Sequence, residues 1–201
     1  KRILDSINLS INKGEFVSIV GGNGAGKSTL IRALLGLIEV TGDILIFDTD
    51  LIKNRDSILN RIGVIFENPA DTFVTNRVSD ELKFSLKNMN LSENEINNRL
   101  QEVTSYLHIE HLLDCIPHSL SGGEKQLVSL GTALMLQPDI LIVDESLNMV
   151  DGVTKEKLLS LLKKLHKDND MTIIYVTHDL EDTLYTDRII LLSDGCISSD
   201  K

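Results

Sequence analysis

The stretch with the clearest chemistry is the glycine-rich run GGNGAGKST at residues 21–29. It fits the pattern G-x-x-x-x-G-K-S/T, which closes on Gly26, Lys27 and Ser28. Such glycines let backbone N–H groups curl around phosphate oxygens, while the lysine supplies a charge to the β and γ phosphates and the serine a hydroxyl to Mg²⁺. The run predicts a nucleoside triphosphate site made of Gly21, Asn23, Gly24, Ala25, Gly26, Lys27, Ser28 and Thr29.

Two adjacent carboxylates form a second candidate site. Asp144 and Glu145 follow four apolar residues, 140–143, which predict a buried strand. Ligands of parallel sheets bind outside the carboxyl ends of the strands, which is where both side chains would emerge. Asp144 is then placed to hold Mg²⁺ through water, and Glu145 to polarise an attacking water as general base. The alternative is that the two carboxylates are a solvated pair in a loop. The glycine-rich run at 21–29 makes this alternative the weaker interpretation.

A single histidine follows another apolar run. His178 comes directly after residues 171–177, MTIIYVT, which also predict a buried strand. A lone histidine is usually a packing residue, but its place at the end of a strand favours a contact with the γ-phosphate. We therefore predict a catalytic set of Lys27, Glu145 and His178.

A second glycine pair lies in SLSGGEKQLVSL, residues 119–130. Its serine and two glycines stand before a charged run that reads as the start of a helix. A glycine pair at this point lets the backbone approach another group closely. Since a complete phosphate loop already lies at residues 21–29, the ligand of this second loop needs an explanation.

Strands and helices alternate along the chain, which is typical of a mostly parallel sheet covered on both faces. A helical region at 79–113, with the capping-box pair Ser92 and Glu95, interrupts this alternation. We expect one domain, 1–201, with an α/β nucleotide-binding core at 1–69 and 131–201 and a helical subdomain at 70–130. The expected strands are 3–11, 15–20, 43–51, 62–66, 139–144 and 171–178, with helices at 28–38 and 154–167 and a final hairpin at 188–198.

Composition narrows the class of protein. The chain has 201 residues and a net charge of −10, which argues against a broad nucleic-acid footprint. No apolar run approaches the roughly 18 residues that cross a bilayer, and Lys1-Arg2 does not open a signal peptide. Cys115 and Cys196 lack metal-ligand spacing, so we expect two buried, reduced thiols in a cytosolic protein. The abrupt start and finish suggest residues missing at both ends.

The order of these motifs resembles the ATP-binding subunit of ABC ATPases over essentially the whole chain. Residues 120–124, LSGGE, match the family's signature loop, and Asp151 matches the loop that crosses its dimer interface. The resemblance implies ATP and Mg²⁺ as cofactors and two subunits that face each other head to tail. Each signature loop then closes on the nucleotide bound by the other subunit, through Ser121, Gly122, Gly123 and Glu124.

A narrower likeness lies at residues 63–88. This region is similar to energy-coupling-factor and cobalt-type importers, and the likeness implies uptake of vitamins or of cobalt or nickel ions. It also implies a second ATPase subunit and transmembrane subunits, at the cytoplasmic face of the cell membrane, whose coupling helices enter a groove near 67–84. The residues that fit are Asn68, Pro69, Asp71, Phe73, Val74, Asp80, Glu81 and Phe84.

Several positions depart from the family pattern. Glu67 replaces a glutamine, and its charge would strengthen metal coordination while repelling the γ-phosphate. We predict that Glu67 joins Ser28 and Asp144 around Mg²⁺; the alternative is a surface glutamate that touches no metal. Leu127 and Gly152 also depart, which suggests a specialised partner, and both a homodimer and a heterodimer stay open.

Three functions are consistent with these motifs. The first is an enzyme that hydrolyses ATP to drive membrane transport. The second is a non-transport ABC ATPase acting on nucleic acid or the ribosome, which the acidic balance disfavours. The third is an ATP-binding regulator without hydrolysis, which an intact Glu145 disfavours.

Overall fold

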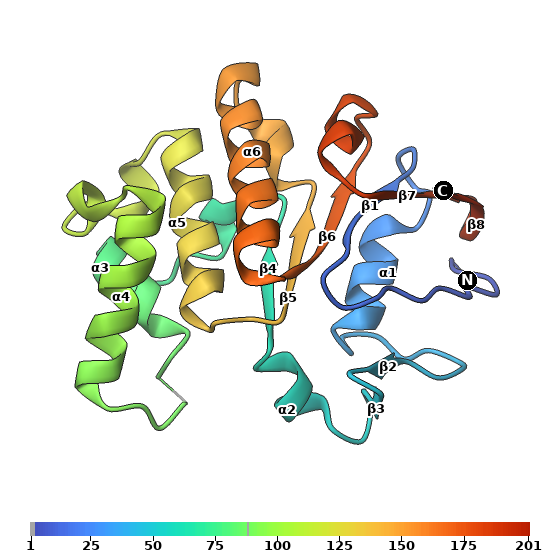
Figure 1. The fold of residues 1–201 in the computed structure, drawn as a ribbon, viewed down its shortest axis with the longest axis horizontal. Helices are drawn as coiled ribbons and strands as arrows, with labels where there is room; N and C mark the ends of the chain where they lie inside the picture. The colour runs from blue at the N-terminus through green and yellow to red at the C-terminus, as the bar shows by residue number, and fades with distance from the viewer. Residues whose placement is uncertain (1–2, 88) are drawn as a thin grey trace.

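Six strands form one sheet at the centre of the computed structural model, which describes residues 3–87 and 89–201 (Figure 1). The strand order is β4-β5-β6-β1-β7-β8, with parallel pairs except for the antiparallel pair β7 and β8. The strands are β1 (Phe16–Val20), β4 (Ile62–Ile65), β5 (Ile140–Asp144), β6 (Thr172–Thr177), β7 (Arg188–Ser193) and β8 (Cys196–Asp200).

Side chains of the central strands alternate between two apolar layers. In β5, Leu141 and Val143 pack into one layer and Ile142 into the other, as the period of two in a strand dictates. Both layers are covered, which explains why these strands are apolar at consecutive positions rather than at alternate ones. The sheet is therefore buried on both faces, and its strand ends are where polar groups can meet solvent.

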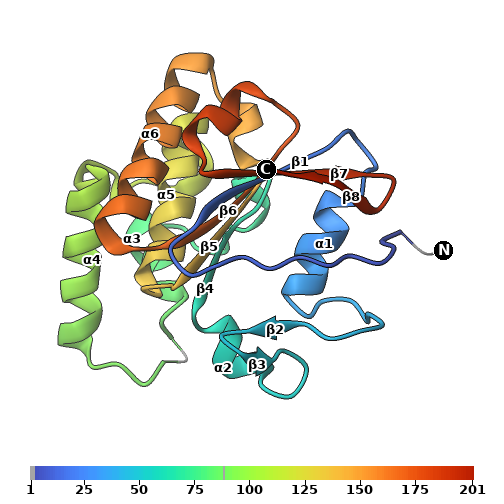
Figure 2. The same ribbon diagram turned by 45° about the vertical axis from the view of Figure 1, so that its right-hand side comes forward.

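Helices cover the two faces unequally. The first helix, α1, lies on one side of the sheet, and α5 and α6 lie on the other (Figures 1 and 2). Two further helices, α3 and α4, pack against α5 and form a helical lobe beside the sheet, where Ser92 and Glu95 form the predicted capping box. The helices are α1 (Lys27–Leu34), α2 (Arg55–Leu59), α3 (Val78–Phe84), α4 (Glu93–Leu107), α5 (Gly122–Met135) and α6 (Gly152–Asn169).

Short 3₁₀ turns connect several of these elements. They lie in the loops, although Leu112 and Leu147 reach the core, and two of them, η4 and η5, follow soon after the carboxyl ends of β5 and β6. The turns are η1 (Pro69–Asp71), η2 (Glu110–Leu112), η3 (Pro117–Ser119), η4 (Ser146–Met149) and η5 (Glu181–Tyr185).

The first predicted strand, at 3–11, is absent: these residues pair with no strand of the described chain. Their alternating Leu4, Ile7, Leu9 and Ile11 instead pack against the apolar layer that holds α1. The alternation therefore reports one-sided burial rather than strand pairing. The antiparallel N-terminal part of the predicted fold is reduced to a small hairpin.

That hairpin replaces the single strand predicted at 43–51. It consists of β2 (Leu45–Ile46) and β3 (Thr49–Asp50), joined by Phe47 and Asp48. Both linking residues have positive φ, 54° and 56°, which is the backbone of a tight turn of type I′. The chain reverses at this point, and a continuous strand is impossible.

Two other expectations need correction or refinement. The helical region at 79–113 is divided into α3, α4 and η2 rather than continuous. The thiols are free, but Cys196 is exposed on the edge strand β8 and Cys115 is only partly buried.

The predicted subdomain boundary at 130 falls inside α5, and the division into core and subdomain stays our proposal. No helix in the described ranges is both long and apolar enough to span a membrane.

Candidate nucleotide site

The loop between β1 and α1 has the geometry of an anion site. Gly24 and Gly26 take φ values of 81° and 107°, in the left-handed region that favours glycine. A Cβ on Gly26 would lie 2.8 Å from Leu4 Cδ2, and its φ would strain any larger residue whatever the space around it. Gly26 also starts α1 without a side-chain cap, which leaves the first N–H groups of the helix for a phosphate.

Lys27 is held inside this loop. Its side chain is only 5% exposed, and its Nζ donates to Gly21 O at 2.7 Å and to Gly22 O at 3.1 Å. The same Nζ lies 2.9 Å from Glu145 Oε1. A phosphate entering the loop would therefore compete with Glu145 for the ammonium group. Binding of the triphosphate would release this carboxylate toward a water molecule.

Glu145 lies between two predicted partners at the end of β5. Besides Lys27, it faces His178, whose Nδ1 is 3.3 Å from Glu145 Oε2. Burial opposes ionisation of Glu145, but hydrogen bonding to Lys27 and His178 outweighs it and holds the pKa of the carboxyl below its usual value. The structure thus brings together all three residues of the predicted catalytic set, with Glu145 ionised as a base must be.

Ser121 begins α5 with a capping box. Its hydroxyl accepts from the Glu124 N–H, and its own N–H donates to Glu124 Oε2 at 2.8 Å. In Figure 1 the start of α5 and the loop before α1 lie at the same upper edge, on opposite sides of α6. Within the described residues no hydrogen bond joins Ser121–Glu124 to residues 21–29. Ser121 and Gly122 of this loop are exposed to solvent.

Asp151 caps α6 and is tied to that loop. Its carboxylate accepts from Thr154 N at 3.1 Å and from Thr154 Oγ1 at 2.7 Å, and these bonds lower its pKa. The methyl group of Thr154 also covers Gly123, where an added Cβ would lie only 2.7 Å from Thr154 Cγ2. Gly123 and Asp151 therefore both lie against Thr154, which links the loop before α5 to the start of α6.

Comparison with known proteins agrees with this arrangement. The family model described as "ABC transporter" matches residues 4–148. The chain belongs to this family. It is 35% identical to the energy-coupling factor transporter ATP-binding protein EcfA of Pediococcus pentosaceus, over 98% of this chain and 71% of that protein. It is also 35% identical to EcfA1 of Streptococcus pyogenes, over 99% and 72%.

Two solved structures place the fold in the same family. CbiO1 of Clostridium perfringens, part of the ABC transporter complex cbiONQ, has a TM-score of 0.92 and 32% identity over 98% of this chain and 81% of its own. The dimeric MJ0796, a bacterial ABC transporter cassette, has a TM-score of 0.86 and 28% identity over 99% and 90%. The chain is an ABC ATPase, an enzyme that couples ATP hydrolysis to transport.

The residues predicted to hold Mg²⁺ in this ABC ATPase suit a cation. Asp144 Oδ1 is buried and has no hydrogen-bond partner within the described residues. Burial, then the nearby charges of Glu145 and Glu67, raise the pKa of Asp144 to about 6. A cation would coordinate the unpaired Asp144 oxygen and would offset the repulsion between the carboxylates. Glu67 and Ser28 are exposed, so their side chains can turn toward the same point.

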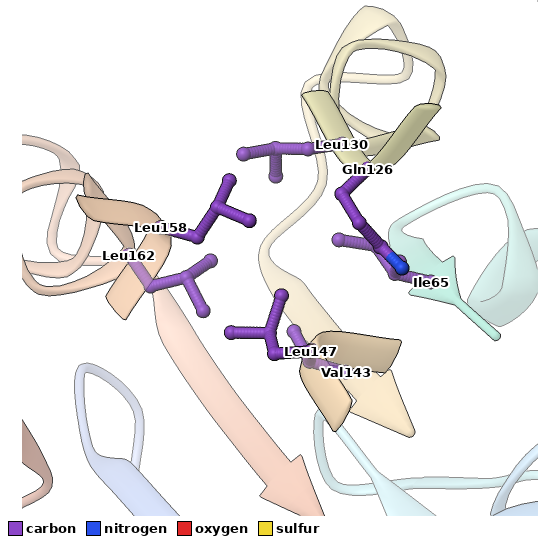
Figure 3. A pocket seen from close by; sticks show the side chains of 7 residues that line it. All are labelled: Ile65, Gln126, Leu130, Val143, Leu147, Leu158 and Leu162. Carbon is purple, nitrogen blue, oxygen red and sulfur yellow. The ribbon is translucent and has the colours of Figure 1, made fainter. Parts of the chain in front are cut away.

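One structural contact of this ABC ATPase escaped the sequence analysis. Gln126 on α5 is buried and its Nε2 donates to Ser146 O at 2.5 Å, directly after Glu145. Figure 3 shows Gln126 among apolar side chains of α5, α6, β4 and β5, which leave a cavity of only about 10 Å³. An amide among apolar residues of a helix is the sequence signal that could have indicated this link between the signature helix and the base.

Proposed function

We propose that this chain is the ATP-hydrolysing subunit of an energy-coupling-factor type importer of vitamins or of cobalt or nickel ions. It works as a head-to-tail dimer with a second ATPase subunit, identical or different, and drives transmembrane subunits from the cytoplasmic face of the membrane. The observation that carries this proposal is the agreement between the motif at 63–88 and relatives that are named as energy-coupling factor and cbiONQ components.

A hollow lined by both aromatic and polar side chains supports docking to a membrane subunit. It lies between β4, η1, α3 and α5, with a volume of about 150 Å³. Phe66 and Phe84 in its lining are 41% and 44% exposed, and exposed aromatic side chains of this kind mark interaction sites. Glu81 fixes the rim, because its buried carboxylate accepts from Val74 N and Thr75 N at 3.0 and 2.8 Å. A hollow at this position supports the predicted docking of a coupling helix near residues 67–84.

The chemistry of hydrolysis follows from residues of this chain. The N–H groups at the start of α1 and the Lys27 ammonium bind the phosphates and stabilise the charge that develops on them. Glu145, released from Lys27, accepts a proton from the attacking water. His178 holds Glu145 on its other side and reaches the γ-phosphate. Mg²⁺, held by Ser28, Asp144 and Glu67, would neutralise part of the triphosphate charge.

The partner subunit completes each site in this proposal. Its Ser121, Gly122 and Gly123 would face the γ-phosphate bound by the first chain, and the start of its α5 would add a second helix terminus there. Asp151 lies between the two sites. The outward-facing capping box and the dimeric MJ0796 structure support this arrangement.

Detachment from the membrane partner tests the transport function. We expect Phe84→Glu to abolish copurification with a transmembrane subunit and ATP-driven uptake in vesicles, because a charge in the groove must be desolvated on docking. ATPase activity of the isolated protein should stay within about twofold, since Phe84 is an exposed residue of α3 and is not one of the predicted nucleotide residues. Leu184→Glu, at a leucine that is 79% exposed, serves as a matched control. Salt-sensitive nucleic-acid binding without any membrane partner would instead support the non-transport function.

Magnesium dependence tests the role of Glu67. We expect Glu67→Gln to raise the Mg²⁺ concentration for half-maximal binding of a fluorescent ATP analogue by about threefold to tenfold, because a neutral oxygen coordinates less strongly than a charged one. Glu102→Gln, on the exposed side of α4, is the control and should leave the titration unchanged. An unchanged titration in Glu67→Gln as well would assign Glu67 to the surface rather than to the metal.

A further inference from the structure

A buried carboxylate organises the segment that carries His178. Asp182 in η5 is 3% exposed, and its Oδ2 accepts from Tyr175 OH and from Thr177 Oγ1, both at 2.8 Å. Thr177 Oγ1 in turn accepts from the Asp179 N–H at 3.0 Å. The backbone is therefore fixed immediately before and after His178, and the geometry of the histidine depends on this cluster.

One cation enters the cluster from a different element. Lys155 on α6 places its Nζ 2.7 Å from Asp182 Oδ1 and 2.8 Å from Asp179 Oδ2, and its side chain is only 16% exposed. Burial disfavours the charge, but hydrogen bonds to Asp179 and Asp182 outweigh it and raise the pKa of Lys155. A half-buried cation loses part of its hydration, and close contacts with two carboxylates, as at Lys155, offset that loss.

The helix end that carries Lys155 also carries Asp151. Lys155 N donates to Asp151 O at 2.9 Å in the first turn of α6, and Asp151 caps the same turn through Thr154. The Lys155 side chain therefore joins two functional segments of one chain. One segment presents His178 to the chain's own Glu145, and the other presents Asp151 at the edge where the partner is expected.

We propose that Lys155 is a positioning residue for ATP hydrolysis, which holds the His178 segment in a fixed place relative to the start of α6. The proposal deepens and rests on the proposed function, since it assumes that His178 acts on the γ-phosphate. Closure of a partner on Asp151 would then change the position of His178 through the contacts of Lys155 with Asp179 and Asp182. Lys155 itself touches neither nucleotide nor Glu145 in this scheme.

Removal of the charge is the first test. We expect Lys155→Met to lower kcat about tenfold while KM for ATP changes less than twofold, because a displaced histidine affects the chemical step and not nucleotide binding. Lys155→Arg should restore kcat to within about threefold of wild type, since a guanidinium can bridge the same two carboxylates. Lys157→Met, at an exposed position of the same helix, is the matched control, with kcat expected within about threefold of wild type.

A double-mutant cycle separates positioning from general destabilisation. In a His178→Ala background, Lys155→Met should lower the remaining single-turnover rate by less than about twofold, because the residue that it positions is already gone. An equal tenfold loss in both backgrounds, or no loss in wild type, would overturn the proposal. If Lys155→Met fails to fold, Asp179→Ala removes the same contact from the other side, and we expect the same kcat loss and the same non-additivity.

The outcome also distinguishes this inference from the proposed function. A wild-type protein that does not hydrolyse ATP under any condition would remove the function on which the inference rests. An active wild-type protein whose kcat is unaffected by Lys155→Met and Asp179→Ala would remove the inference alone.

Discussion

Glu145→Gln should slow ATP turnover by about 10²–10⁴-fold, the usual contribution of a general base. The amide keeps the shape of the side chain and can still accept a hydrogen bond from Lys27 Nζ, which lies 2.9 Å from Glu145 Oε1. It cannot accept a proton from water, so nucleotide binding should persist while hydrolysis stops. Steady-state phosphate release measures the first expectation, and retention of labelled ATP on a sizing column measures the second.

The same variant should also accumulate as a dimer in the presence of ATP, because a trapped nucleotide keeps favouring the closed state. Glu156→Gln, at an exposed position of α6, is the matched control and should turn over like wild type. Near-normal turnover by Glu145→Gln would mean that another group is the base, and the assignment of Lys27, Glu145 and His178 as one catalytic set would be wrong.

Gly123→Ala should lower kcat by about 10²-fold, the cost of displacing a reacting group by about 1 Å. The new Cβ would lie 2.7 Å from Thr154 Cγ2, so either α5 or α6 has to shift at this contact. Thr154 cannot simply rotate, because its hydroxyl bonds Asp151 Oδ2 at 2.7 Å. Either the signature loop moves away from the partner's nucleotide or the cap of α6 breaks. Phosphate release under saturating ATP is the measurement.

A second substitution in the same chain provides the control for Gly123→Ala. Thr154→Ser removes the clashing methyl group but keeps a hydroxyl for Asp151, so the double variant should regain activity to within about tenfold of wild type. Thr154→Ser alone should stay within about threefold. If Thr154→Ser gives no rescue, then Gly123 acts through its backbone freedom and not through the contact with Thr154.

The sequence predicted the loop, the helix start and the strand ends of the candidate nucleotide site well, because their signals are local. The pattern at 21–29 encodes a loop and a helix start within nine residues, and the strand before Asp144 is a continuous apolar run. Such signals need no knowledge of distant partners. Their convergence at one edge of the sheet follows from parallel pairing of β1, β5 and β6, which the alternation of strands and helices indicated.

Features that depend on distant partners were predicted less well. The alternating apolar residues at 3–11 indicate that one side of this segment is buried. They do not indicate whether the segment pairs as a strand or packs against the layer that holds α1. The turn at Phe47 and Asp48 uses positive φ at residues that do not usually adopt it, so 43–51 was wrongly predicted as one strand. Lys155 carries no sequence signal at all, because its partners Asp179 and Asp182 come from another element.

The central claim is that each ATP is held by two chains, so a single chain is catalytically incomplete. The most direct measurement is ATPase activity per subunit over a dilution series, with the dimer fraction in each sample determined by sedimentation velocity in ATP. We expect activity per subunit to fall in proportion to the dimer fraction and to vanish where only monomer sediments. Undiminished turnover from samples that contain only monomer would contradict the account.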